Sequence, residues 1–134
     1  MKDRNKRNDF KKADYRLVSY DKMDDESSVR KTLIEGARDF SKNLNSTYHQ
    51  LRKYYEEVLS VYRDVKKKNE FDDSQKIRIY LLSSKANYDV HRQSAKLDPA
   101  FRDFIDNWVE NIKDKKDVEK FKIVFEAILG FAKK

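Results

Sequence analysis

The sequence of 134 residues contains no cysteine, one proline and two glycines. Without cysteine the chain has no disulfide, no thiolate ligand for zinc and no cysteine nucleophile, a composition that suits the reducing cytoplasm. Because glycine and proline are so few, the tight turns that join short strands are scarce, and long helices with short links are favoured. The sequence therefore predicts an all-α protein.

Long apolar runs are absent as well. No run approaches the roughly 18 residues that a transmembrane helix needs, so the sequence predicts no membrane span. The charged start at Met1–Arg7 is followed by no apolar stretch of the kind that secretory signals contain. We therefore expect a cytoplasmic protein that makes no use of a membrane.

Catalytic and metal-binding patterns are equally scarce. His49 and His91 are isolated and match no metal-ligand spacing, while Gly36 and Gly130 stand alone and form no phosphate-binding loop. The carboxylates lie among lysines and arginines, which is typical of a solvated surface. We therefore expect no enzymatic activity, no metal site and no cofactor.

Charge, in contrast, is abundant. Charged residues make up 41% of the chain, whereas about 25% is usual for globular proteins. The 31 lysines and arginines outnumber the 24 acids and give a net charge of +7. Such an excess favours nucleic acid or another polyanion as a partner. Aromatic residues, at 13%, still supply enough bulky material for the core of one domain.

The first 26 residues differ from the rest of the chain. Their first dozen residues hold six cations, their end is acidic, and their apolar residues follow no sustained helical period. We expect residues 1–26 to be a charged arm that is flexible or only weakly helical. Residues 27–134 are then expected to be a single helical-bundle domain.

Apolar residues recur at helical spacing through the remainder of the chain. The clearest start signals are a capping box of Thr47 and Gln50, and the pair Asp98–Pro99, in which Asp caps and Pro suits the first helical position. The short links between segments favour antiparallel neighbours. The pattern predicts a compact bundle of about five helices, over residues 29–44, 47–68, 74–96, 99–113 and 117–132.

The predicted helix over residues 74–96 has two different faces. One apolar stripe, which includes Ile79 and Leu82, is of the core-facing kind. The opposite stripe mixes aliphatic residues with two cations and a phenol: Ile77, Leu81, Lys85, Tyr88 and Arg92. This stripe is either a contact face for a polar, anionic partner, or a second core layer along which the two cations extend to solvent.

The predicted helix over residues 47–68 carries a second candidate face. Opposite its core stripe lie His49, Arg52, Lys53, Arg63 and Lys67. This face either keeps the protein soluble or contacts phosphates, which arginine binds through paired hydrogen bonds and lysine as a point charge. Tyr54, at the edge of the core stripe, is either boundary packing or a donor to a sugar or phosphate. Trp108, on the fourth predicted helix, is expected to be core.

Three segments together resemble a known family. They are Leu51-Arg-Lys-Tyr-Tyr-x-x-Val58, then Leu82-x-x-Lys85-x-x-Tyr88-x-x-x-Arg92, and finally Phe121-x-x-x-Phe125-Glu126-Ala127-Ile128-x-x-Phe131-x-Lys133. In this order and spacing, the chain from about residue 46 onward is similar to the small subunit of the type III-A CRISPR–Cas interference assembly, the Csm complex. Gly130-Phe-Ala departs from the Ala-Tyr-His that the family often has there.

The resemblance implies an all-helical, non-catalytic subunit of this antiviral effector, stacked in several copies. Its implied partners are the duplex of guide and target RNA, other subunits and copies of itself. Because such a subunit serves guides of any sequence, it must hold RNA by the backbone. The alternative is a helical protein–protein adaptor whose positive charge is incidental, and salt-dependent RNA binding separates the two.

The motifs also supply candidate site residues. Those that match the first two motifs, and that we expect to bind RNA, are Arg52, Lys53, Lys85, Tyr88 and Arg92, with Tyr88 holding the stems of Lys85 and Arg92. Further possible contacts are His49, Tyr54, Arg63 and His91. We also expect weak self-association through the mixed stripe and through an uncovered apolar surplus on the fourth helix.

Overall fold

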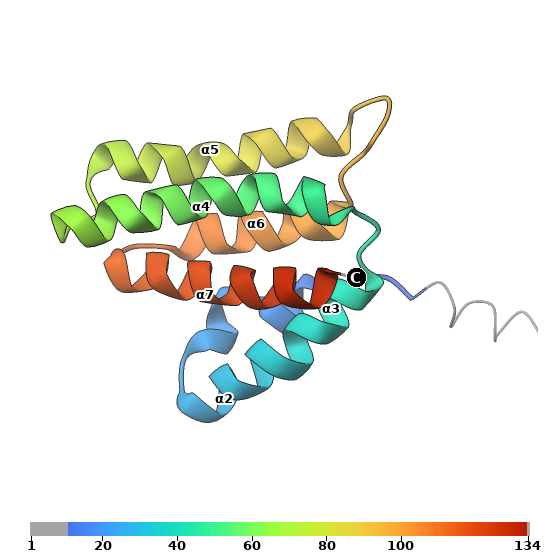
Figure 1. Ribbon diagram of the computed structural model, residues 1–134, viewed down its shortest axis with the longest axis horizontal. Coiled ribbons are helices and arrows are strands. Elements are labelled where there is room, and N and C mark those ends of the chain that lie inside the picture. Colours follow the sequence, from blue (N-terminus) through green and yellow to red (C-terminus); the bar gives the residue numbers. More distant parts are fainter. Residues whose placement is uncertain (1–10, 134) are drawn as a thin grey trace, which may run out of the picture.

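The computed structural model describes residues 11–133, and over this range the chain is all-helical without a strand. Four helices form an antiparallel bundle (Figure 1): α4 (Tyr48–Lys68), α5 (Asp73–Val90), α6 (Pro99–Asn111) and α7 (Lys115–Ala132). In this bundle α4 packs against α7, while α5 packs against α6 and α4. No helix in the described range is long and apolar enough to cross a membrane.

The first long helix lies obliquely beside α7 (Figure 1). It consists of α2 (Glu26–Lys31), a π-helical turn labelled η3 (Thr32–Gly36) and α3 (Ala37–Asn43), joined without a break. Phe40 of α3 is fully buried, and the Ser41 hydroxyl donates to the Ile128 carbonyl of α7 at 2.8 Å. With these segments taken as one helix, the predicted arrangement of about five helices is close to the observed one.

Local capping residues fix several of the helix starts. Thr47 and Gln50 form the predicted capping box, with bonds of 3.1 and 2.7 Å to each other's backbone N–H groups. Asp98 caps α6, whose first residue is Pro99. For α5 the start lies slightly before the predicted one, because Asp72 is the N-cap residue.

The end of α5 corrects a prediction, since the helix stops at Val90 and not near residue 96. Residues 91–98, here called loop 91–98, turn back so that Leu97 is buried and its N–H donates to the Asp89 carbonyl at 3.1 Å. Ala95 adopts a left-handed φ of 52°, and its carbonyl accepts from the Gln50 side chain at 2.8 Å. Burial of Leu97 and this contact with α4 therefore favour a loop at residues 91–98, and α5 does not continue to residue 96.

The core of the protein is largely aromatic. Phe101, Phe104, Phe121 and Phe125 are fully buried and pack with centroid distances of 5.5 to 5.9 Å. Trp108 is also fully buried and stacks on Phe121 at 5.2 Å, which confirms its predicted core role. The prediction of an uncovered apolar surplus on the fourth helix is wrong, because the α6 side chains Phe101, Phe104 and Trp108 are fully buried.

Part of that cover comes from residues 14–23, which form two 3₁₀ turns, η1 (Tyr15–Val18) and η2 (Tyr20–Met23). Val18 and Met23 are buried, and the Trp108 indole N–H donates to the Val18 carbonyl at 2.9 Å. Of the two alternatives predicted for the arm, flexible or weakly helical, residues 14–23 match the weakly helical one. Their apolar residues lack an α-helical period because they dock through short 3₁₀ turns. The first ten residues of the predicted arm lie outside the described range.

Candidate nucleic-acid interface

Eight of the nine predicted RNA-binding residues are exposed and come from α4, α5 and the start of loop 91–98. Helices α4 and α5 lie side by side (Figure 1), and the line along which they pack is here called the α4–α5 seam. The mixed stripe on α5 is exposed too: Ile77 is 55%, Leu81 58% and Tyr88 72% accessible. The second-core-layer interpretation is therefore wrong, and the stripe is a surface.

Two motif cations meet at one carboxylate on this seam. Lys85 Nζ lies 3.9 Å from Asp89 Oδ2, and Arg92 Nη1 lies 3.8 Å from Asp89 Oδ1. The same carboxylate accepts a hydrogen bond from the Tyr54 hydroxyl of α4, and the Lys85 ammonium lies 5.5 Å from the Tyr54 ring centroid. We call Tyr54, Lys85, Asp89 and Arg92 the Asp89 cluster.

Tyr54 has a supporting position and not a contact position. Its side chain is only 1% exposed, and burial, together with the hydrogen bond to Asp89, raises the pKa of its phenol far above the usual value. The phenol is therefore a neutral donor to Asp89. This burial favours the boundary-packing interpretation of Tyr54 over a direct RNA contact.

The Asp89 cluster keeps a surplus of positive charge at the surface. Its two ion pairs are long, and the Lys85 and Arg92 side chains are 52% and 42% exposed. The Asp89 side chain is only 15% exposed, but at these lengths and with both cations at the surface each pair is weak, so a phosphate group competes with Asp89 for Lys85 and Arg92. Lys53 and Gln50 line the same small cavity as Tyr54, Asp89 and Arg92, which adds a third cation to the seam.

Arg52, the neighbour of Lys53, points along α4 and not into the seam. Its Nε donates to Glu56 at 2.9 Å and its Nη1 to the Tyr48 hydroxyl at 3.2 Å. The hydrogen bond to Glu56 is the main cause of the raised pKa of Arg52. His49 and Arg63 are exposed on α4 as well. The structure thus brings Lys53, Lys85 and Arg92 together but leaves Arg52 beside Glu56.

Two further predicted residues lie where α5 meets loop 91–98: Tyr88 in the last turn of the helix and His91 at the start of the loop. They line a shallow hollow together with Arg92, and His91 Nδ1 lies 2.9 Å from the Asn87 carbonyl. The aromatic contact observed for Lys85 is with the Tyr54 ring of α4. Tyr88 is a largely exposed aromatic ring beside Arg92.

Sequence reasoning missed Asp89, the residue that joins the two cations. A signal was present, because Asp89 follows Lys85 by four residues and precedes Arg92 by three, the spacings at which side chains meet on a helix. The contribution of Tyr54 from a different helix had no local signal. No group of three or more potential metal ligands is found within residues 11–133.

Comparison with known proteins gives one result. A family model described as Csm2 Type III-A matches residues 27–134, which include all the predicted RNA-binding positions. No curated protein and no solved structure matches the chain. Residues 14–23, which cover Trp108, precede the matched region.

Proposed function

Since the chain belongs to the Csm2 Type III-A family, and is on that account a subunit of a type III-A CRISPR effector complex, we propose that it holds RNA there through the phosphate backbone. In this proposal the subunit is non-catalytic, stacks in several copies and contacts the target RNA and its duplex with the guide in antiviral defence. The observation that carries the proposal is the convergence of Lys85 and Arg92 on Asp89, beside Lys53.

Backbone contact suits both the residues and the task. Arginine and lysine bind phosphate without regard to the base, which a subunit serving guides of any sequence requires. Tyr54 packs beneath Lys85, and loop 91–98, which carries Arg92, is held to α4 by Gln50, so both charges are presented at defined places on the surface. The exposed Tyr88 ring adds a surface on which a base or ribose can rest.

A protein contact is supported by a separate observation. Ile77 and Leu81 are more than half exposed on α5, at the end away from Arg92, and Tyr80 is 48% exposed nearby. An apolar strip of this kind marks an interaction surface. We assign it to a neighbouring copy or another subunit of the complex, next to and not in place of the RNA face.

Salt dependence of RNA binding tests the proposal against the adaptor alternative. The experiment is a gel-shift series with the full chain and two long single-stranded RNAs of unrelated sequence, at several salt concentrations. We expect binding that weakens steeply with salt and that is about equal for the two RNAs. An adaptor with incidental charge would bind neither RNA, and base readout would separate the two sequences.

A further inference from the structure

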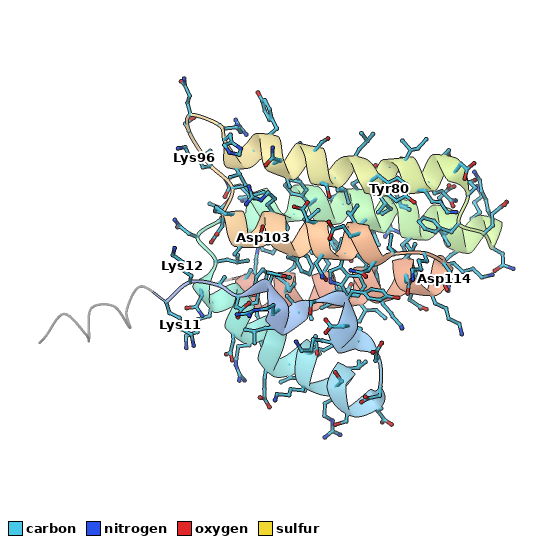
Figure 2. All side chains as sticks on the ribbon, turned by 180° about the vertical axis from the view of Figure 1, so that it is seen from behind. Lys11, Lys12, Tyr80, Lys96, Asp103 and Asp114 are labelled. Carbon is cyan, nitrogen blue, oxygen red and sulfur yellow. The ribbon has the colours of Figure 1, made fainter. Side chains whose placement is uncertain are left out.

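A groove of about 1020 Å³ opens at the end of the bundle where α3 ends and α6 begins. The segment before η1, the end of α3 and loop 91–98 line it. Four exposed lysines border the groove: Lys11, Lys12, Lys42 and Lys96. Figure 2 shows Lys11, Lys12 and Lys96 at this end of the molecule, whereas Asp114 lies at the opposite end.

The carboxylates of the groove are already engaged. Asp98 accepts the backbone N–H of Ala100, in the first turn of α6, at 2.9 Å, and that of Asn45, in the link between α3 and α4, at 2.7 Å. Asp103 pairs with Arg102 at 3.4 Å. Within residues 11–133 no ion pair involves any of the four lysines. Four lysines against two carboxylates leave the groove lining with a surplus of positive charge.

Loop 91–98 connects this groove to the Asp89 cluster. Arg92, near the start of the loop, belongs to the cluster, and Lys96, near its end, borders the groove. Leu97 lines both cavities. Because Gln50 holds the Ala95 carbonyl at 2.8 Å, the loop is fixed to α4. Basic side chains thus follow one path from the α4–α5 seam, over the loop and into the groove.

We propose that the groove is a second contact site for the phosphodiester backbone of single-stranded RNA, so that one strand runs from the Asp89 cluster over loop 91–98 to the four lysines. This inference rests on the proposed RNA-binding function. Lysine binds phosphate as a flexible point charge, which suits a strand of any sequence. Lys11 and Lys12 precede residue 27, so a segment outside the family match builds one side of the site.

The test compares two variants of the full chain that lose the same charge. The groove variant is Lys11→Gln/Lys12→Gln/Lys42→Gln/Lys96→Gln. The control variant, at the other end of the bundle, is Lys66→Gln/Lys113→Gln/Lys115→Gln/Lys116→Gln, and all four of its lysines are exposed. Affinity for oligouridines of increasing length is measured against salt concentration for both variants and the unchanged protein.

With long oligouridines, the plot of log affinity against log salt concentration should be less steep for the groove variant, by about 0.7 for each lost phosphate contact. The control variant should keep the slope of the unchanged protein. With the shortest oligouridines that still bind, which fit on the seam alone, the groove variant should behave like the control. Equal slopes for both variants at every length would overturn the second site.

A Lys85→Ala variant in the same series separates this inference from the proposed function. If Lys85→Ala weakens binding while groove and control variants agree, the seam stands and the groove assignment falls. If only the groove variant weakens binding, the second site stands and the seam assignment falls. Poly-glutamate serves as a model of an acidic protein. If it binds the unchanged protein but not the groove variant, while the groove variant binds RNA as the unchanged protein does, the groove is a site for an acidic protein and the RNA site is overturned.

Discussion

Asp89 sets the charge balance at the centre of the proposed RNA face. It lies within 4 Å of two cations and accepts a hydrogen bond from the buried Tyr54, yet its ion pairs are long and partly exposed. Such long pairs to cations at the surface hold side chains weakly, while a negative charge so close opposes phosphate. Competition with phosphate is therefore the larger effect of Asp89.

The substitution Asp89→Asn tests this balance, since asparagine still accepts the Tyr54 hydroxyl. We expect RNA affinity to rise about fivefold, which corresponds to about 1 kcal/mol for removal of one nearby charge. The control is Glu110→Gln, which changes net charge equally at an exposed site on α6 and should have a smaller effect. A loss of affinity in Asp89→Asn would show that Asp89 mainly positions the two cations.

Tyr55 gives the protein a dependence on alkaline pH. Burial, with Glu126 beside the hydroxyl at 3.1 Å, raises the pKa of Tyr55 from 10.0 to about 12. The folded chain therefore keeps a proton that the unfolded chain loses. Stability should fall as pH rises from about 10 to about 12, by about 1.4 kcal/mol for each pKa unit. In Tyr55→Phe, urea unfolding should show a shallower fall over this range, and an unchanged slope would contradict the assignment.

At the scale of elements, Gly36 lets the 3₁₀ turns approach the first helix. A Cβ at Gly36 would lie 2.4 Å from the Leu17 carbonyl oxygen, which is backbone and unable to move aside. Gly130 in α7 is the matched control, because a Cβ there meets nothing within 4 Å. The two glycines therefore have different consequences although both are helical.

Gly36→Ala should destabilise the protein by about 1–3 kcal/mol, since overpacking outweighs the gain in helix propensity. Gly130→Ala should stabilise it by up to about 1 kcal/mol. Urea unfolding of both variants measures the two changes. Equal stabilisation by both substitutions would show that η1 does not pack against the first helix as described.

Local signals made most elements predictable. The capping box at Thr47 and the Asp98–Pro99 start are set by residues next to one another, and the structure contains both. The end of α5 was not predictable, because it depends on burial of Leu97 and on Gln50 from another helix. The turns of residues 14–23 were missed since their buried residues follow no α-helical period.

The candidate site, too, has residues that the sequence predicts and residues that only the packing of helices reveals. The exposed cations of α4 and α5 were found from their helical faces, since a charged residue opposite a core stripe must reach solvent. The role of Tyr54 was not predictable, because its position beneath Lys85 depends on how α4 and α5 pack together. Convergence between helices is a property of the fold and not of either segment alone.

At the scale of the whole molecule, the exposed apolar strip on α5 predicts weak self-association. Leu81→Gln should reduce the average mass measured by light scattering at high protein concentration, because it places a polar amide in an apolar contact. The control is Ile34→Gln, which changes an aliphatic residue of similar exposure on the first helix. If the unsubstituted protein is strictly monomeric, or if both variants have an equal effect, the apolar strip on α5 is not a site of self-association.

The central claim is that the α4–α5 seam holds RNA by phosphate contacts. The most direct test is the slope of log affinity against log salt for Lys85→Ala/Arg92→Ala, with Arg52→Ala measured beside it. The control is Lys66→Ala/Lys67→Ala/Lys68→Ala, in which Lys68 already pairs with Asp64 at 3.5 Å.

For single-stranded RNA each lost phosphate contact should flatten the slope by about 0.7. The account predicts a loss of about 1.4 for the seam double variant, equal for unrelated RNA sequences, and a smaller change for the triple lysine control. If the triple control flattens the slope more than the seam variant does, the RNA lies on a different face and the account is contradicted.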